Sequence, residues 1–143
     1  MKYESFELNG FLPFQLSVMT ERIRKELTSR FAPEFQLSVP EWRVLVQLWG
    51  SEGVSVRELH VAVAMDKSKV SRAASRLESA GMVEKRENAD DRRLLQIRLT
   101  QQGSELVMRL IPIAHEFETE LALRLGGDAP AFRRALEHLM AWE

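Results

Sequence analysis

The 143-residue chain contains no cysteine. This absence excludes disulfide bonds, thiolate zinc sites and thiol-based redox sensing within the chain. The chain also has no apolar run long enough to span a bilayer, and its first residues lack the pattern of a signal peptide. We therefore expect a cytoplasmic protein.

Net charge is also nearly absent, at −1, so the overall charge does not indicate a nucleic-acid-binding protein. The charges are unevenly distributed, however. Residues 65–100 contain nine Lys or Arg and six Asp or Glu, a local charge of +3 that leaves −4 for the rest of the chain. A local excess of this kind gives one face a basic footprint without making the whole protein basic.

The segment 67–77 contains no carboxylate and is predicted to be a helix with two different faces. Its small and apolar residues recur at helical spacing and predict a buried face. They are Val70, Ala73 or Ala74, and Leu77. The other face carries cations and hydroxyls, which contact phosphates and base edges in a DNA groove. The DNA-binding residues predicted on it are Lys67, Ser68, Lys69, Ser71, Arg72, Ser75 and Arg76. For this segment alone, a solvated charged helix is the alternative.

A short helix precedes the basic helix. Residues 55–58, Ser-Val-Arg-Glu, have the form of a capping box and predict a helix that ends near Ala64. Residues 65–66 then form a turn, and Gly81 ends the basic helix. Two helices joined by a tight turn form a helix-turn-helix. This arrangement favours DNA binding over a merely solvated charged helix.

After Gly81 the apolar pattern changes to a period of two residues. Residues 82–87 and 95–99 are predicted to form a β-hairpin around a turn-rich tip. A hairpin after a recognition helix is a wing, and Arg92 and Arg93 at its tip can reach the narrow minor groove of DNA. An ordinary salt-bridged loop is the alternative for this tip.

The remaining chain predicts further helices, and the fold is expected to be mainly α with a small β-wing. Their expected ranges are 13–31, 40–50 with Ser38 or Val39 as cap, 100–125 capped by Thr100, and one after Asp128. Trp42 and Trp49 are predicted to be core residues rather than a ligand cage. We predict a winged helix-turn-helix of about six helices in a single domain, 1–143.

Several motifs together resemble those of a known family. They are residues 41–45 (Glu-Trp-Arg-Val-Leu), 66–72 (Asp-Lys-Ser-Lys-Val-Ser-Arg), 76–78 (Arg-Leu-Glu), Gly81, 91–93 (Asp-Arg-Arg), 99–100 (Leu-Thr) and Gly103. The Asp-x-Arg followed at a fixed offset by Leu-Thr-x-x-Gly is the most specific of them. Over nearly its whole length the sequence resembles the MarR family of winged-helix transcriptional regulators.

This resemblance implies a homodimer formed by residues 11–31 and 101–143, with a DNA-binding lobe at 38–100. It also implies recognition helices in successive major grooves and Arg93 in a flanking minor groove. Asp91 would orient the wing by pairing with an arginine of the recognition helix, Arg72 or Arg76. Repression relieved by a small aromatic or anionic effector, and a pseudo-palindromic operator, follow from the same resemblance.

An effector would need a pocket, which we expect in the hinge region between the dimer helices and the DNA-binding lobe. The residues predicted to line it are Met19, Arg22, Ile23, Trp42 and Val46. Their mixture of apolar, aromatic and cationic side chains suits a small aromatic acid. Simple core packing of these residues is the alternative.

Other functions find little support in the sequence. The three histidines are scattered without ligand spacing, and there is no glycine-rich phosphate loop or nucleophile–base pair. We therefore predict no metal, no cofactor and no enzymatic activity. The main alternative to a DNA-binding regulator is a winged-helix module used only for protein–protein assembly.

Overall fold

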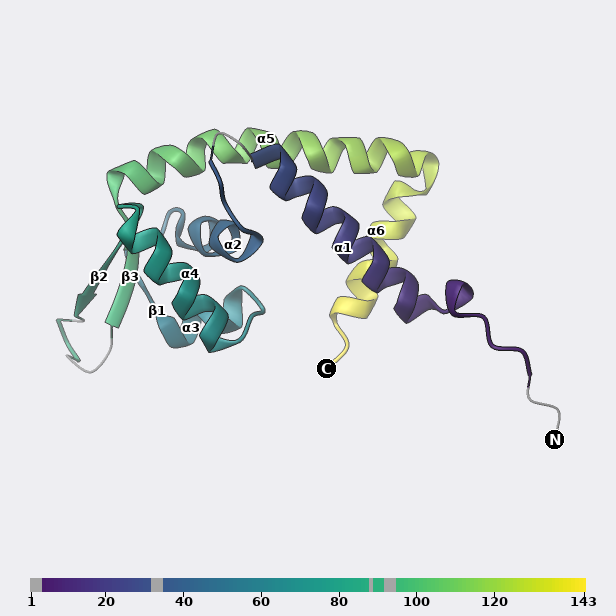
Figure 1. Cartoon of the computed structure of the whole chain (residues 1–143), viewed down its shortest axis with the longest axis horizontal. Coiled ribbons are helices and arrows are strands. Elements are labelled where there is room, and N and C mark those ends of the chain that lie inside the picture. Colours follow the sequence, from purple (N-terminus) through teal and green to yellow (C-terminus); the bar gives the residue numbers. More distant parts are fainter. Residues whose placement is uncertain (1–3, 32–34, 88, 92–94) are drawn as a thin grey trace. The chain divides into compact units, whose positions relative to one another are not determined.

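The computed structural model describes residues 4–31, 35–87, 89–91 and 95–143. Six α-helices, two 3₁₀ helices and three strands follow one another within these residues (Figure 1). In chain order they are η1 Leu8–Gly10, α1 Leu12–Phe31, α2 Val39–Leu48, β1 Val54–Ser55, α3 Val56–Ala62, α4 Lys67–Ser79, β2 Val83–Glu87, β3 Leu95–Leu99, α5 Gln101–Leu125, η2 Gly126–Asp128 and α6 Ala129–Met140. The expected fold class, mainly α with a small β-wing, is confirmed.

The chain divides into two compact units. The first is Met1–Val107, which contains the helix-turn-helix and the sheet, and the second is Met108–Glu143. Helix α5 begins in the first unit and ends in the second. The candidate functional site described below lies entirely in the first unit.

Three helices of the first unit begin at polar side chains that accept hydrogen bonds from free backbone amides. Ser38 accepts from the amide of Glu41 at the start of α2, at 3.3 Å. Ser55 and Glu58 form the predicted capping box at the start of α3. At the start of α4, Asp66 accepts from the amide of Lys69 at 2.9 Å. These caps fix where the elements of the helix-turn-helix begin.

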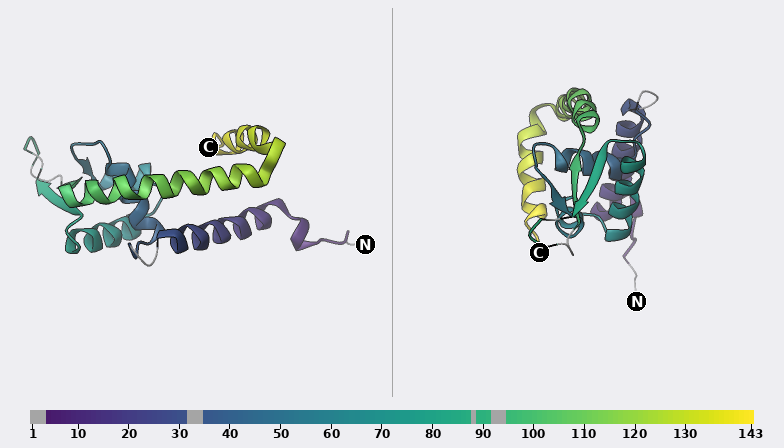
Figure 2. Two further views of the ribbon diagram at one scale, coloured as in Figure 1. Left: turned by 90° about the horizontal axis from the view of Figure 1, so that it is seen from above. Right: turned by 90° about the vertical axis from the view of Figure 1, so that its left-hand side faces the viewer.

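The sheet is antiparallel, with strand order β1-β3-β2. Strands β2 and β3 form the predicted hairpin, in which Val83 pairs with Leu99 and Lys85 with Ile97. The right-hand view of Figure 2 shows these two strands as adjacent arrows. The third strand, β1, was not predicted from the sequence, and it pairs with β3 at Val54–Ile97. The hairpin is therefore joined to the segment that leads into α3.

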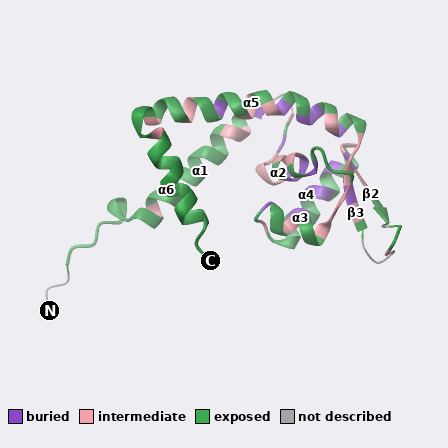
Figure 3. Ribbon diagram, turned by 180° about the vertical axis from the view of Figure 1, so that it is seen from behind, coloured by how far each residue is buried: buried purple, intermediate pink, exposed green. Residues whose placement is uncertain are grey.

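The core of the first unit lies where α2, α3 and α4 pack against the sheet, and its buried residues appear purple in Figure 3. Its fully buried side chains include Val44, Leu45, Leu48, Leu59, Val70, Leu77, Ile97 and Val107. Each buried leucine or isoleucine of this kind contributes about 1.5–3 kcal/mol from removal of its apolar surface from water. Of the two tryptophans predicted to be core residues, Trp42 is half-buried, and its ring centroid lies 5.0 Å from that of Phe31. The prediction for Trp49 was wrong, because it follows the last turn of α2 and is 41% exposed.

Exposed apolar side chains are most numerous on α1 and α6. On α1 these include Leu12, Leu16, Met19 and Ile23, and on α6 Phe132, Leu136, Leu139 and Met140. All described residues of α6 but Ala129 are exposed, as Figure 3 shows in green. Within the described residues, no helix combines the length and the apolar character that crossing a bilayer requires.

Candidate nucleic-acid interface

Helix α4 separates its small and apolar side chains from its charged and hydroxyl side chains. Val70, Ala73, Ala74 and Leu77 are buried against α2, α3 and β2. All seven residues predicted to bind DNA on this helix are exposed, namely Lys67, Ser68, Lys69, Ser71, Arg72, Ser75 and Arg76. The structure therefore brings these seven side chains together on the solvent-facing side of one helix. We refer to this surface as the basic face of α4.

One cation of the basic face is held by a carboxylate from another helix. The Arg76 Nη1 donates to Oε1 of Glu41 at 3.3 Å, linking α4 to α2. Glu41 is 8% exposed, whereas the Arg76 side chain keeps 67% of its surface in solvent. A buried carboxylate is costly unless it is paired, so this contact favours a fixed position for Arg76. Glu41 belongs to the 41–45 motif, but no local pattern assigns it to Arg76, which is 35 residues away in the chain.

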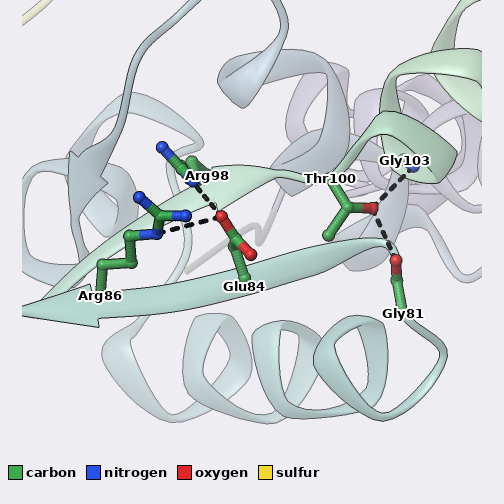
Figure 4. Close-up of polar contacts among 6 residues, drawn as sticks. All are labelled: Gly81, Glu84, Arg86, Arg98, Thr100 and Gly103. Carbon is green, nitrogen blue, oxygen red and sulfur yellow. Dashed lines mark hydrogen bonds and ion pairs between the residues drawn. The ribbon is translucent and has the colours of Figure 1, made fainter.

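The end of α4 and the start of α5 are tied together through Thr100 (Figure 4). Its Oγ1 donates to the carbonyl oxygen of Gly81 at 2.6 Å and accepts from the amide of Gly103 at 3.0 Å. The Thr100 amide donates to the carbonyl of Met82 at 3.0 Å. Gly81 has φ +78°, a conformation in which glycine is favoured. The Leu-Thr-x-x-Gly motif thus fixes the point where the chain passes from α4 into the hairpin of β2 and β3.

The wing hairpin carries a cluster of charges on one side of its strands. Glu84 of β2 pairs with Arg98 of β3 across the strands and with Arg86 at 3.2 Å (Figure 4). The hydrogen bond from Arg98, with the charge of Arg86, holds the pKa of Glu84 below its usual value. Glu84 therefore stays ionised at neutral pH and joins the two strands of the wing.

The predicted tip of the wing is only partly described. Arg92 and Arg93, both predicted to bind DNA, lie outside the described residues. Asp91 is half-buried and engaged in an interaction. Its pairing with Arg72 or Arg76 stays a prediction, while Arg76 has the Glu41 contact described above.

A small hollow of about 230 Å³ lies beside the basic face. Lys69, Arg72, Ala73 and Arg76 of α4 line one side, and Ser38 and Pro40 at the start of α2 line the other. Three cations and a helix start thus border one hollow, an arrangement that suits an anion such as a phosphate.

A larger cavity of about 680 Å³ lies between α1, α2 and the turn before α4. Of the five residues predicted for an effector pocket, Ile23 and Trp42 line this cavity. Met19, Arg22 and Val46 are not among its lining residues. The remaining lining residues are Thr20, Arg24, Leu27, Val39, Pro40, Arg43, Ala64, Met65, Asp66 and Lys69. The cavity therefore reaches the first turn of α4, which was not among the residues predicted to line it.

No group of three or more metal-ligating side chains occurs in the described part of the chain. These surfaces present cations, hydroxyls and a cavity with one aromatic side chain, Trp42, in its wall. Such surfaces bind anions and small organic ligands.

The sequence is related to known transcriptional regulators. A family model described as MarR family matches residues 35–94. The chain is 30% identical over 125 residues to the HTH-type transcriptional regulator SarZ of Staphylococcus saprophyticus, a match that covers 85% of each protein. It is 34% identical over 73 residues to the Transcriptional repressor MprA of Escherichia coli, and this match spans 50% of the chain but only 42% of MprA.

A solved structure shares the fold over nearly the whole chain. It is that of BpsR from Bordetella bronchiseptica, described in connection with regulation of its DNA binding by 6-hydroxynicotinic acid. The match has a TM-score of 0.82 at 23% identity and covers 96% of this chain and 95% of BpsR. Together with the family model and the similarity to SarZ, this common fold leads to one conclusion: the chain belongs to the MarR family of winged-helix transcriptional regulators.

Proposed function

We propose that the protein is a sequence-specific DNA-binding regulator that acts as a homodimer on a pseudo-palindromic operator. The observation that carries this proposal is the basic face of α4, with seven exposed cationic or hydroxyl side chains opposite a buried apolar face. A helix of this kind enters the major groove, where hydroxyls and cations meet base edges and phosphates. Its named relatives are transcriptional regulators and not enzymes.

Most of the affinity would come from neutralisation of phosphates and would therefore fall steeply with salt. Base discrimination would come from the N-terminal half of α4, through Ser68, Lys69, Ser71 and Arg72. The cationic hollow between α4 and the start of α2 would hold a backbone phosphate. In the wing, Arg93 would enter the minor groove with Arg92 beside it, and Asp91 would orient the tip.

The dimer is proposed from the exposed apolar side chains. Residues 11–31 and 101–143 would supply the dimer interface, and 38–100 would form the DNA-binding lobe of a single regulator domain. The exposed apolar residues of α1 and α6 support this arrangement, because a second chain would remove them from water. A two-fold dimer would place its two half-sites about ten base pairs apart, centre to centre.

The regulator is proposed to be a repressor that a small aromatic or anionic compound releases from DNA. The cavity of about 680 Å³ supports this, since it lies within the size range of ligand sites and contains Trp42 together with cations. The relative BpsR is regulated in its DNA binding by 6-hydroxynicotinic acid, a small aromatic acid. We propose the same class of effector for this chain.

The proposal is tested by selecting duplexes from a random pool and measuring their affinity for the wild type and Arg93→Ala. We expect a palindromic consensus, and a loss of about 1–3 kcal/mol in Arg93→Ala without unfolding. Unchanged affinity of a folded Arg93→Ala dimer would reject the minor-groove role. An assembly module without DNA binding would show no salt-sensitive retention on random duplex DNA, and that result would reject the main proposal.

A further inference from the structure

Lys69 occupies a position shared by two separate cavities. It lines the cavity of about 680 Å³ beside α1 and also the hollow of about 230 Å³ on the basic face of α4. Among the lining residues of these two cavities, Lys69 and Pro40 are common to both, and of the pair only Lys69 is charged. Lysine has a flexible four-carbon stem, so its ammonium can reach a partner on either side.

We propose that a small aromatic carboxylate in the larger cavity and a DNA phosphate compete directly for the Lys69 ammonium. This inference rests on the proposed function, because it assigns the way in which effector and DNA exclude each other. It makes Lys69 the residue that couples the two sites, without requiring a change in the spacing of the recognition helices.

The cavity has a wall that suits an aromatic ring. Trp42 is half-buried there and is held in place by its ring contact with Phe31. Ile23, Leu27 and Val39 add apolar surface around it. A single six-membered ring is much smaller than about 680 Å³, which leaves room for its substituents and for water.

The other charged groups of the cavity already have partners. Arg24 forms two hydrogen bonds with Glu21, at 2.9 and 2.6 Å. Arg43 donates to the carbonyl oxygen of Val63 at 3.4 Å, and the Asp66 carboxylate accepts from the backbone amide of Lys69.

The Lys69 side chain differs from these groups. Within the residues that the structure describes, its ammonium has no hydrogen bond or ion pair. A carboxylate entering the cavity would therefore meet Lys69 as the cation whose pairing breaks no existing contact. Lys69 is also one of the three basic residues that line the hollow proposed to hold a phosphate.

Direct competition has a distinct signature in the salt dependence. Each phosphate contact contributes about 0.9 to the slope of log affinity against log salt. If the ligand removes one Lys69 contact per protomer, the slope of a dimer becomes shallower by about 1.8. A ligand that changed only the spacing of the recognition helices would act equally well on a protein without Lys69.

The experiment compares the wild type with Lys69→Met and with the matched control Lys67→Met. Lys67 is also an exposed cation in the first turn of α4, but it lines neither cavity. Benzoate is the probe, benzamide its uncharged counterpart, and acetate at the same concentration controls for ionic strength. Affinity for a duplex recovered by selection is measured over a range of salt, and benzoate binding is measured by calorimetry without DNA.

We expect benzoate to weaken DNA binding of the wild type and Lys67→Met by about 5-fold or more, and to flatten their salt slopes. Lys69→Met should bind DNA more weakly from the start and should respond little to benzoate. Benzamide and acetate should have little effect on any of the three proteins. By reciprocity, DNA should lower the benzoate affinity of the wild type by the same factor.

Two results would overturn the inference and leave the proposed function intact: an equal benzoate response of Lys69→Met and wild type, or no benzoate binding at millimolar concentration. If the wild type bound no DNA, the proposed function would fail instead. Calorimetry would still test the contact between benzoate and Lys69 in that case. Weaker benzoate binding by Lys69→Met than by Lys67→Met would support this contact, and equal binding would contradict it.

Discussion

Replacement of Gly103 by alanine should weaken the junction between α4 and α5. Gly103 is buried in the first turn of α5, and a Cβ built there would lie 1.9 Å from the carbonyl oxygen of Met82 and 2.9 Å from its carbon. Real Cβ contacts essentially never fall below 3.0 Å, so the backbone must separate by about 1.1 Å. The same carbonyl accepts the hydrogen bond from the Thr100 amide at 3.0 Å.

The expected cost follows from these contacts. Forcing extra volume into a packed site costs about 1–3 kcal/mol, and loss of the hydrogen bond adds about 0.5–1.5 kcal/mol. Alanine also lowers the conformational entropy of the unfolded chain, which raises the free energy of unfolding by about 0.4–1 kcal/mol. We therefore expect Gly103→Ala to lower the free energy of unfolding by about 2 kcal/mol, the centre of a range from about 0.5 to about 4 kcal/mol.

The assay is urea denaturation at one fixed protein concentration, because association changes the apparent stability. The matched control is Gly127→Ala, since a Cβ there meets nothing within 4 Å. It should leave stability unchanged or raise it by up to about 1 kcal/mol. If Gly103→Ala unfolded within about 0.5 kcal/mol of the wild type, the close approach to Met82 would not be a constraint on the fold.

Three further predictions concern the wing, the exposed helix face and a cap. Arg98 lowers the pKa of Glu84 in the folded protein, so the ionised Glu84 carboxylate stabilises the fold. This stabilisation is complete above the ordinary glutamate pKa of about 4.3 and is lost as the pH falls through the lowered pKa of the folded protein. The difference in melting temperature between wild type and Glu84→Gln should therefore shrink in acid, and a difference that grew would contradict the assignment. Leu16 of α1 is 39% exposed and lies in the proposed dimer interface, so Leu16→Glu should yield monomers in sedimentation. Val61 of α3 is 70% exposed but lies outside that interface, so Val61→Glu should sediment as the wild type does. Ser55→Ala removes the capping box of α3 and should cost about 1 kcal/mol in urea denaturation, and an unchanged midpoint would show that the cap contributes nothing.

The local features of the helix-turn-helix could be predicted from the sequence because they depend on neighbours in the chain. The capping box at Ser55 and Glu58 involves residues three positions apart, and the buried face of α4 follows from helical periodicity. The hairpin of β2 and β3 was predictable because its residues alternate over several positions. These signals are short-range, and the structure confirms them.

Features that depend on distant contacts were not predictable in the same way. The strand β1 has two residues, too few for a periodic signal, and exists through its pairing with β3. Glu41 has no local signal that assigns it to Arg76. Tryptophan is a residue type that is usually buried, but Trp49 lies past the last turn of α2 and is exposed. In each case the tertiary arrangement decides the outcome.

The lining of the larger cavity was predictable only in part. Ile23 and Trp42 could be named because a pocket was expected in the hinge region between the dimer helices and the DNA-binding lobe. Asp66 and Lys69 line the same cavity from the first turn of α4, which the sequence had assigned to DNA alone. Only the packing of α1 against the rest of its unit reveals that Lys69 borders both this cavity and the hollow on the basic face.

The central claim is that two copies of this chain present their basic α4 faces and wings to one DNA duplex. The most direct measurement is the affinity and stoichiometry of binding to a duplex obtained by selection, between about 50 and 200 mM salt. We predict two chains per duplex and an affinity that falls linearly with salt on logarithmic axes. Absence of binding at the lowest salt, or binding of a single chain without salt dependence, would contradict the claim.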